Sequence, residues 1–276
     1  MLKYPEIDPI AFSVGPLTVH WYGLMYLAGF AAAYALAMHR SGKDWTPIRK
    51  SQVDDLVVWV ALGVILGGRC GYVFFYQFER FLEDPLWLFR VWEGGMSFHG
   101  GLLGVILAMV LYSRHIKISF LALMDFVAPL VPPGLGFGRI GNFIGQELWG
   151  RETTWEYGMI FPKDPEGLVR HASQLYQAAL EGLLLFVILF LYSRKPRPMG
   201  TVGSLFLICY GAFRFIVEFF REPDSHIGFD FAGWMTRGQL LSLPMILVGI
   251  ILFVWFYLRG NKPTPNSDPE PAPSKS

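Results

Sequence analysis

The chain carries little charge for its length. Only 16% of its 276 residues are Asp, Glu, Lys or Arg, whereas soluble domains carry about a quarter. Hydrophobic residues make up 53%, and they gather in runs of roughly 20 residues, each long enough to cross a hydrocarbon core of about 30 Å. These features exclude an ordinary soluble domain and predict a polytopic membrane protein.

The chain also has few cysteines, almost no net charge and no internal repeat. Because Cys70 and Cys209 each lie inside an apolar run, we interpret them as small buried hydrophobes and not as disulfide or metal-site residues. The net charge is +1, and no basic tract indicates a nucleic-acid partner. We find no internal repeat in the sequence, which argues against a transporter built from inverted repeats.

The apolar runs predict an all-α polytopic membrane protein with seven transmembrane helices. The first run is too long for the apolar region of a signal peptide, so we expect it to remain as a span. In the fourth, Pro129, Pro132 and Pro133 predict an interrupted helix whose end lines a cavity. The expected spans are about 17–38, 54–76, 97–113, 120–138, 173–193, 201–220 and 238–258.

The distribution of basic residues predicts the orientation. Lys and Arg concentrate after spans one, three and five and at the start of the tail, whereas the loops near 77–96, 139–172 and 221–237 mix signs or lean acidic. The positive-inside rule then puts the N-terminus outside and the C-terminus in the cytoplasm. We expect one transmembrane domain over 1–260, with a sizeable extracytoplasmic loop region at about 139–172, and a disordered cytoplasmic tail over 261–276.

Arginines lie in or at the ends of three apolar segments, at Arg69, Arg139 and Arg214. An arginine at lipid depth is costly and usually faces a partner, a cavity or a substrate. In the predicted orientation all three fall in the outer half of the membrane, as do His99 and Asn142. Four spans therefore converge on one leaflet, which indicates a single outward-facing site for an anion.

Span six adds a geometric prediction. Tyr210, Arg214, Glu218 and Arg221 are spaced four, four and three residues apart, so they share one helical face. Arg214 and Glu218 are expected to form an ion pair. This pair has a purely structural interpretation as a neutralised couple, but it does not account for the arginines of the other spans.

Several polar residues have structural interpretations. Arg69, flanked by glycines, is expected to brace helix packing. Glu181 and Asp125 are expected to hydrogen-bond neighbouring helices, Tyr22 fits an aromatic belt, and the acidic pair at 54–55 suits the first turn of a helix.

His99 lies among small residues, in the segment 94–101, which leave space around its imidazole. Histidine is a natural general base near neutral pH, although a lone interfacial histidine is more often structural. The residues alone leave both roles open.

Six strings of residues together resemble the phosphatidylglycerol–prolipoprotein diacylglyceryl transferase family, over nearly the whole chain except the tail. Departures are small: Gly145-Gln146 stands where the family often has Asn-Gly, and Ala172 and Gln177 where it often has Pro and Glu. The strings are His20-Trp21-Tyr22-Gly23-Leu24, Gly95-Met96-Ser97-Phe98-His99-Gly100-Gly101, Gly138-Arg139-Ile140-Gly141-Asn142-Phe143, Glu147-Leu148-Trp149-Gly150, Ser173-Gln174-Leu175-Tyr176, and Tyr210-Gly211-Ala212-Phe213-Arg214 with Glu218 and Arg221.

The resemblance implies transfer of the diacylglyceryl group of phosphatidylglycerol to the lipobox cysteine of a preprolipoprotein. The products would be a thioether-linked lipid and glycerol 1-phosphate. The resemblance also implies the bacterial plasma (inner) membrane, a site facing away from the cytoplasm, and no metal or nucleotide cofactor. The expected partners are phosphatidylglycerol, the preprolipoprotein signal peptide and membrane lipids, with no nucleic acid.

Roles follow for the matching residues. His99 is the candidate base for the thiol, and Arg214 joins it as a catalytic residue because guanidinium groups suit the leaving phosphate. An alternative is that Arg214 itself assists thiol deprotonation while His99 shapes the site. The residues expected to bind phosphatidylglycerol are Arg139, Asn142, Glu147, Gly150, Tyr22, Tyr210, Glu218 and Arg221.

Two rival functions remain at the level of sequence. A transporter or flippase of an anionic lipid explains the arginines equally well, but it predicts polar groups along both halves of the membrane. A scaffolding protein with ion-paired helices predicts that losing Arg139 or Arg214 impairs folding without a separate loss of chemistry.

Overall fold

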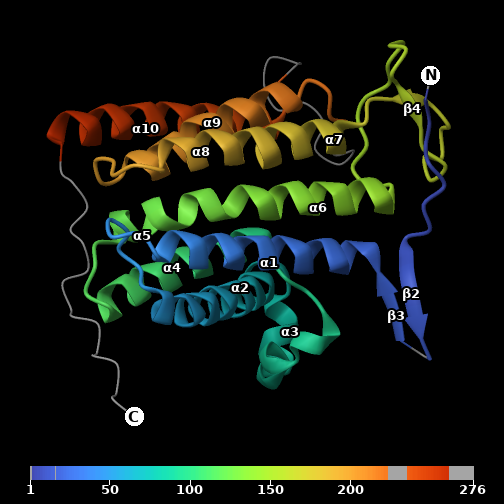
Figure 1. The fold of residues 1–276 in the computed structure, drawn as a ribbon. Helices are drawn as coiled ribbons and strands as arrows, with labels where there is room; N and C mark the ends of the chain where they lie inside the picture. The colour runs from blue at the N-terminus through green and yellow to red at the C-terminus, as the bar shows by residue number, and fades with distance from the viewer. Residues whose placement is uncertain (1, 16, 223–234, 261–276) are drawn as a thin grey trace. The chain divides into compact units, whose positions relative to one another are not determined.

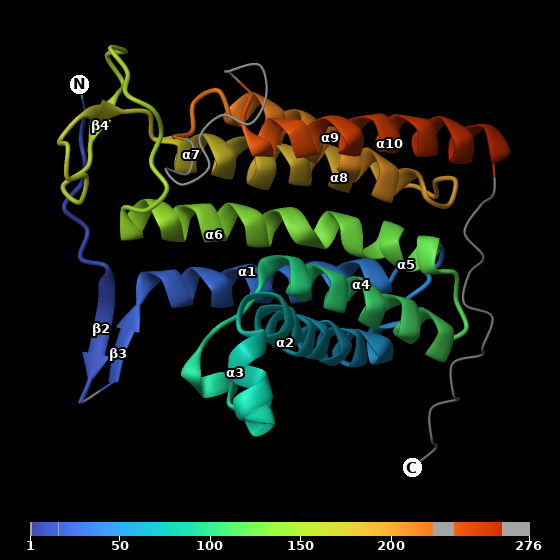
Figure 2. The ribbon, with the colours of Figure 1, turned by 180° about the vertical axis from the view of Figure 1, so that it is seen from behind.

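The structure, a computed structural model, describes residues 2–15, 17–222 and 235–260, and most of this chain is helical (Figures 1 and 2). The predicted tail over 261–276, and most of the predicted loop over 221–237, lie outside the described residues. The chain divides into two compact units, a larger one from residues 1–37 and 124–263 and a smaller one centred on 38–123.

Five helical stretches of the described chain are long and apolar enough to cross a membrane, which confirms a polytopic membrane architecture. Two further predicted spans coincide with helices that fall outside this set, α4 (Phe98–His115) and the shorter α9 (Thr201–Val217). The five stretches are Trp21–Ser41, Lys50–Tyr76, Phe120–Gly145, Ser173–Tyr192 and Arg237–Arg259.

The larger unit is built mainly of helices. Within it, α6 lies between α1 and the layer formed by α7, α8 and α9 in both ribbon views (Figures 1 and 2). Asp125 confirms its predicted role, because its carboxylate accepts hydrogen bonds from the backbone N–H groups of Gly200 and Gly203 at the start of α9. The elements are α1 (Trp21–Ser41), α5 (Phe120–Val127), the 3₁₀ turn η4 (Ala128–Leu130), α6 (Val131–Gly145), α7 (Ser173–Gln177), the π-helical η5 (Ala178–Leu184), α8 (Leu185–Tyr192), α9, and α10 (Arg237–Arg259).

Two predicted helix boundaries were wrong. The first helix begins at Trp21 and not at residue 17, because Leu17–His20 forms strand β3, which pairs with β2 (Ile10–Val14) in a hairpin. The fourth span is not broken by its prolines: α5 continues through η4 into α6, which runs to Gly145. Pro129 and Pro132 stand in the first turns of η4 and α6. Proline is tolerated there because the backbone N–H groups of a first turn have no acceptor within the same element.

A small amount of strand structure supplements the helices, where the sequence predicted an all-α protein. The strands β1 (Leu2–Lys3), β4 (Met159–Ile160) and β5 (Val169–Arg170) form a three-stranded sheet in that order. Tyr4, Phe143 and Phe161 pack with Met159 of β4 in one buried cluster. The Tyr4 hydroxyl is 3.1 Å and 3.0 Å from the carbonyl oxygens of Phe143 and Ile144 at the end of α6, which ties the N-terminal segment to this helix.

The smaller unit packs α2 (Val53–Tyr76) closely against α4. A Cβ atom on Gly67 would lie 2.4 Å from the carbonyl oxygen of Gly100, and one on Gly104 would lie 2.1 Å from that of Gly63. The glycines beside His99 therefore serve helix packing, since such close approach tolerates no side chain. The unit also contains η1 (Lys50–Gln52), α3 (Phe78–Glu83), η2 (Pro85–Phe89) and η3 (Val91–Glu93).

Arg69 has a structural role, as predicted, but it holds a connecting segment and does not brace helix packing. Its guanidinium donates to the carbonyl oxygens of Leu88 at 3.0 Å, Trp87 at 2.6 Å and Gly94, and it lies over the Trp87 ring at 4.4 Å. With 2% of the residue exposed, Arg69 fastens the 77–97 connection to α2. The acidic residues Asp54 and Asp55 occupy the first turn of α2, also as predicted.

Candidate active site

The site begins with α6, which carries Arg139 and Asn142 three residues apart and therefore on one face. Both lie inside the helix and not in the loop predicted to start at 139. Gly136 lets α6 approach η5 closely, because a Cβ on Gly182 would lie 2.6 Å from the Gly136 Cα atom. This crossing brings Arg139, one turn further along, beside Glu181.

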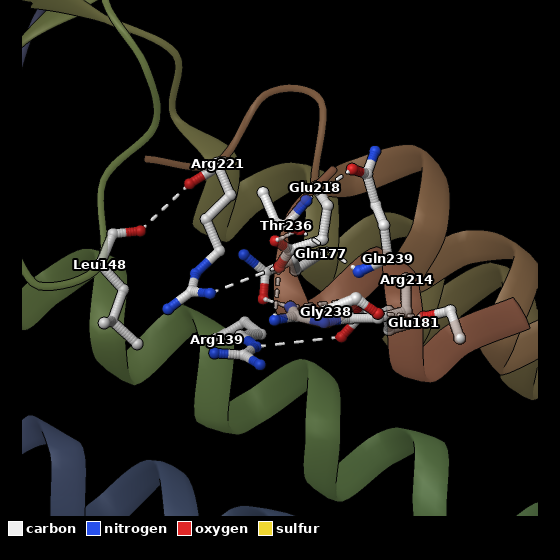
Figure 3. Close-up of polar contacts among 12 residues, drawn as sticks. Arg139, Leu148, Gln177, Glu181, Arg214, Glu218, Arg221, Thr236, Gly238 and Gln239 are labelled. Carbon is white, nitrogen blue, oxygen red and sulfur yellow. Dashed lines mark hydrogen bonds and ion pairs between the residues drawn. The ribbon is translucent and has the colours of Figure 1, made fainter. Parts of the chain in front are cut away.

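Glu181 lies in the middle of η5, and its side chain is fully buried. The Arg139 Nε atom is 4.0 Å from Glu181 Oε2, and the Arg214 Nη1 atom is 3.8 Å from Glu181 Oε1. Figure 3 shows the three side chains converging from α6, η5 and α9. The prediction that Glu181 hydrogen-bonds neighbouring helices was wrong, since within the described chain its oxygens have ion-pair partners but no hydrogen-bond donor.

Glu218 confirms the predicted pairing with Arg214. Its Oε1 atom is 2.6 Å from Arg214 Nη2 and 3.3 Å from Arg221 Nη1, while its Oε2 atom accepts a 2.7 Å hydrogen bond from Thr236 (Figure 3). Thr236 is the N-cap of α10, so the buried carboxylate also lies where a helix favours negative charge. Gly238 makes room for it, because a Cβ there would lie 2.6 Å from the Glu218 carboxyl carbon.

The arginines of this cluster keep part of their surface exposed, while the carboxylates do not. The exposed side-chain fraction is 22% for Arg139, 17% for Arg214 and 14% for Arg221, against 0% and 1% for Glu181 and Glu218. These three arginines and two glutamates carry a formal excess of one positive charge. The arrangement suits an anion that approaches the exposed sides of the guanidinium groups.

The loop after α6 folds back onto this end of the helix. Asn142 is buried, and its side-chain amide lies 3.5 Å from the Glu147 carboxylate. The backbone turns through left-handed conformations at Gln146 and Leu148, and Gln174 donates a 2.7 Å hydrogen bond to the Glu147 carbonyl. Asn142 and Glu147 are thus held together, with the Glu147 side chain on the surface.

Gly150 is the crossing point of three backbone segments. Its N–H donates to the His171 carbonyl at 2.9 Å, and a Cβ atom would lie 2.4 Å from the Phe220 carbonyl oxygen. Arg151 strengthens the crossing by donating to the carbonyl oxygens of Arg221 and Glu218. Gly150 is expected from the family resemblance to bind phosphatidylglycerol, but here its close backbone contacts are made by the chain itself, which gives this glycine a structural reason.

The loop also contains a buried ion pair. Arg170 donates to Asp164 from Nε at 2.6 Å and from Nη2 at 3.3 Å, and its side chain also pairs with Glu166 and Glu222. The Arg170 guanidinium holds the pKa of the Asp164 carboxyl below its usual range. Burial lowers the pKa of the nearby His171 imidazole, which favours its neutral form.

The remaining predicted site residues divide between the two units. Tyr22, in the first turn of α1, packs on Gly141 of α6, and its hydroxyl lies 3.1 Å from that of Tyr26. Tyr210 precedes Arg214 by one turn of α9 and stacks on Phe206. His99 belongs to the smaller unit, near the start of α4, with its side chain exposed. Within the larger unit the structure gathers the other nine predicted residues around the ends of α6 and α9.

A family model for prolipoprotein diacylglyceryl transferase matches residues 9–255. The chain belongs to this family. Its relatives named phosphatidylglycerol–prolipoprotein diacylglyceryl transferase include that of Teredinibacter turnerae, 67% identical over 93% of each chain. The relative from Pseudoalteromonas atlantica is 62% identical over 94% of this chain and 92% of its own. The relative from Acinetobacter baylyi is 57% identical over 94% of this chain and 96% of its own. These matches confirm the resemblance seen in the sequence.

Sequence reasoning on this transferase-family chain missed part of the site. The sequence predicts only a structural role for Glu181, although a carboxylate in an apolar run beside arginine-bearing helices is itself a signal of a charge partner. Gln177, which accepts a 3.3 Å hydrogen bond from Arg214, and Thr236 carried no such signal. No group of three or more His, Cys, Asp or Glu side chains in the described ranges is arranged to hold a metal ion.

Proposed function

We propose that this chain transfers the diacylglyceryl group of phosphatidylglycerol to the lipobox cysteine thiol of a prolipoprotein, the first step of bacterial lipoprotein maturation. The observation that carries this proposal is the convergence of Arg139 and Arg214, part-exposed guanidinium groups from different helices, over one buried carboxylate. Phosphatidylglycerol has a single phosphodiester, and a pair of guanidinium forks suits its oxygens.

The reaction exchanges one bond for another at a glyceryl carbon. The cysteine sulfur forms a bond to the carbon that carries the phosphodiester, the bond from that carbon to the phosphate oxygen breaks, and its electron pair leaves with glycerol 1-phosphate. Negative charge therefore grows on the phosphate, where Arg139 and Arg214 stabilise it. Such preorganised charges are worth more in a site screened from bulk water.

The thiol proton needs an acceptor, since the thiolate is the nucleophile. His99 is the proposed general base, and the alternative assigns thiol activation to Arg214. Replacing His99 with Gln separates the two, because full activity of a folded His99→Gln protein would remove His99 as the base.

Other residues of the larger unit are proposed to bind the lipid head group. Asn142 and Glu147 lie together and offer a donor and an acceptor for the glycerol hydroxyls. Glu218 orients Arg214 through its 2.6 Å ion pair. Tyr22, Tyr210, Gly150 and Arg221 complete the proposed set by shaping the pocket and adding positive potential.

For the membrane arrangement, we propose seven spans, with α4 and α9 crossing in addition to the five long apolar stretches. The N-terminus would lie outside, the C-terminus in the cytoplasm, and the site on the extracytoplasmic side of the bacterial inner membrane. Phosphatidylglycerol would enter sideways from the outer leaflet, and the prolipoprotein would be tethered by its signal peptide, which raises its effective concentration. Alkaline phosphatase fusions at each loop test this order, and activity at loops 43–50 or 194–197 would contradict it.

The decisive test is transfer by the purified protein in bilayers. The substrates are phosphatidylglycerol and a lipobox peptide, and mass spectrometry follows the cysteine. A diacylglyceryl mass gain that is lost in a folded Arg139→Ala protein supports the reaction and its anion site. No mass gain from folded protein that binds the lipid would overturn the proposal in favour of lipid transport.

A further inference from the structure

Glu181 is a buried carboxylate for which the proposed reaction has no direct use. Its side chain is fully buried in the π-helical η5, and neither oxygen has a hydrogen-bond donor among the described residues. Burying an ionised carboxylate without hydrogen bonds is costly, so its environment must supply compensating charge. The two guanidinium groups that face it supply that charge.

The two arginines approach different oxygens of this one carboxylate. Arg139 faces Oε2 at 4.0 Å and Arg214 faces Oε1 at 3.8 Å, distances typical of ion pairs and too long for hydrogen bonds. The carboxylate therefore lies between two like charges and offsets their repulsion. Meanwhile it leaves the N–H groups of Arg139 without a hydrogen-bond acceptor in the described part of the chain.

The burial of the three side chains is uneven. Glu181 is inaccessible, whereas 22% of Arg139 and 17% of Arg214 is exposed. The carboxylate thus occupies the inner side of the arginine pair, and a ligand reaches the pair from the other side. Without the Glu181 charge, the cluster would keep the three positive charges of its arginines against the single negative charge of Glu218.

We propose that Glu181 is a positioning residue that fixes the spacing of Arg139 and Arg214 and moderates their charge, so that the pair binds the lipid phosphate yet releases the phosphate product. The inference rests on the proposed function of this arginine pair as the phosphate site. Arg214 has further anchors in Glu218 and Gln177, whereas the ion pair of Arg139 is with Glu181. Loss of the carboxylate charge should therefore displace Arg139 more than Arg214.

The test is Glu181→Gln, which keeps the size and planar shape of the side chain and removes its charge. A phosphate would then bridge the two guanidinium groups without competition from the inner carboxylate. A full charge removed at about 4 Å is a large change in this setting, so we expect inhibition by glycerol 1-phosphate to strengthen by about tenfold. The KM for phosphatidylglycerol should fall, and kcat should fall by about tenfold because product leaves slowly and the pair is misplaced.

Two further variants separate positioning from general structure. Glu166→Gln makes the same chemical change at a side chain that is 62% exposed and outside the cluster. It should leave the KM for phosphatidylglycerol, kcat and the inhibition by glycerol 1-phosphate unchanged. Glu181→Asp keeps the charge but withdraws it by one methylene, so kcat should fall while inhibition by glycerol 1-phosphate stays near the wild-type value. Thermal unfolding of each variant shows whether it is folded.

The kinetic results distinguish failure of the inference about Glu181 from failure of the proposed function. If wild type forms the thioether but folded Glu181→Gln keeps the wild-type KM, kcat and product inhibition, the inference is wrong and the proposed function stands. The inference is also wrong if Glu181→Gln and Glu181→Asp both lower kcat with weaker inhibition by glycerol 1-phosphate. If wild type itself forms no thioether, it is the proposed function that fails.

Discussion

Arg69 in the smaller unit and Arg139 in the larger one are both arginines on apolar helices, yet their guanidinium groups have different partners. The Arg69 guanidinium donates hydrogen bonds to backbone carbonyl oxygens of the 87–94 segment and packs on the Trp87 ring. The Arg139 guanidinium faces one carboxylate at 4.0 Å and is 22% exposed. Saturated donors hold a chain in place, whereas donors left open on a charged, part-exposed group are available to a ligand.

The same contrast separates the glycines of the two units. On α2 and α4, Gly67 and Gly104 lie so close to the backbone of the partner helix that a Cβ atom would not fit, and these contacts fix the helix pair. On α6, Gly134 and Gly138 have open space where a Cβ would be, while Gly136 and Gly141 meet η5 and Tyr22. The identity of a residue is therefore a weaker guide to its role than the partners that its backbone and side chain find.

The largest expected effect is loss of transfer in Arg139→Gln. Removing one preorganised charge at the leaving phosphate should lower kcat/KM by about 10²–10³-fold, with Tm close to wild type because Arg214 still faces the buried Glu181 carboxylate. Lysine at this position should recover only part of the loss, since it lacks the planar fork. The bilayer transfer assay and thermal unfolding measure both quantities, and a large drop in Tm would assign Arg139 to structure.

Arg69→Gln should show the reverse pattern. It leaves buried carbonyl oxygens of the 87–94 segment without donors, at a cost of about 1–3 kcal/mol each. We expect a clearly lower Tm, while kcat per folded molecule stays near wild type. If transfer fell and Tm did not, the distinction drawn between the two arginines would be lost.

Alanine substitutions at glycines sharpen the comparison with a smaller effect. Gly67→Ala places a methyl group 2.4 Å from the Gly100 carbonyl oxygen, and overpacking of this kind costs about 1–3 kcal/mol. Gly134→Ala has open space and should stabilise α6 by about 0.5–1 kcal/mol, since alanine favours the helix. Unfolding in mild detergent compares the two, and equal Tm values would refute the packing argument.

The smallest expected effect is a pH dependence in the loop region. Because the folded-state pKa of Asp164 is lowered by Arg170, its contribution to stability is present above the unfolded carboxyl pKa of about 3.9 and is lost as pH falls below it. Asp164→Asn should therefore have a lower Tm than wild type at pH 6, and the gap should narrow toward pH 3. A gap that is constant with pH would mean that Asp164 acts through hydrogen bonds alone.

Much of the architecture was predictable from composition and periodicity. Long apolar runs must be helices in a membrane, because only a helix satisfies its own backbone. The i, i+4 spacing also predicted the Arg214–Glu218 pair before any tertiary contact was known. The helix ends were predicted less well. The strand before Trp21 and the continuation of the helix past its prolines depend on local backbone hydrogen bonds, which the hydropathy of the sequence does not reveal.

The sequence by itself determined the membrane class, the family and the residue types that handle an anion, because these follow from composition and local strings. Only the tertiary structure decided which carbonyl oxygens Arg69 binds, which glycines are packed, and that Glu181 lies between two guanidinium groups. Those facts depend on distances between helices that are far apart in the chain. A carboxylate from η5 meets arginines from α6 and α9 only because Gly136 and Gly182 let the helices approach.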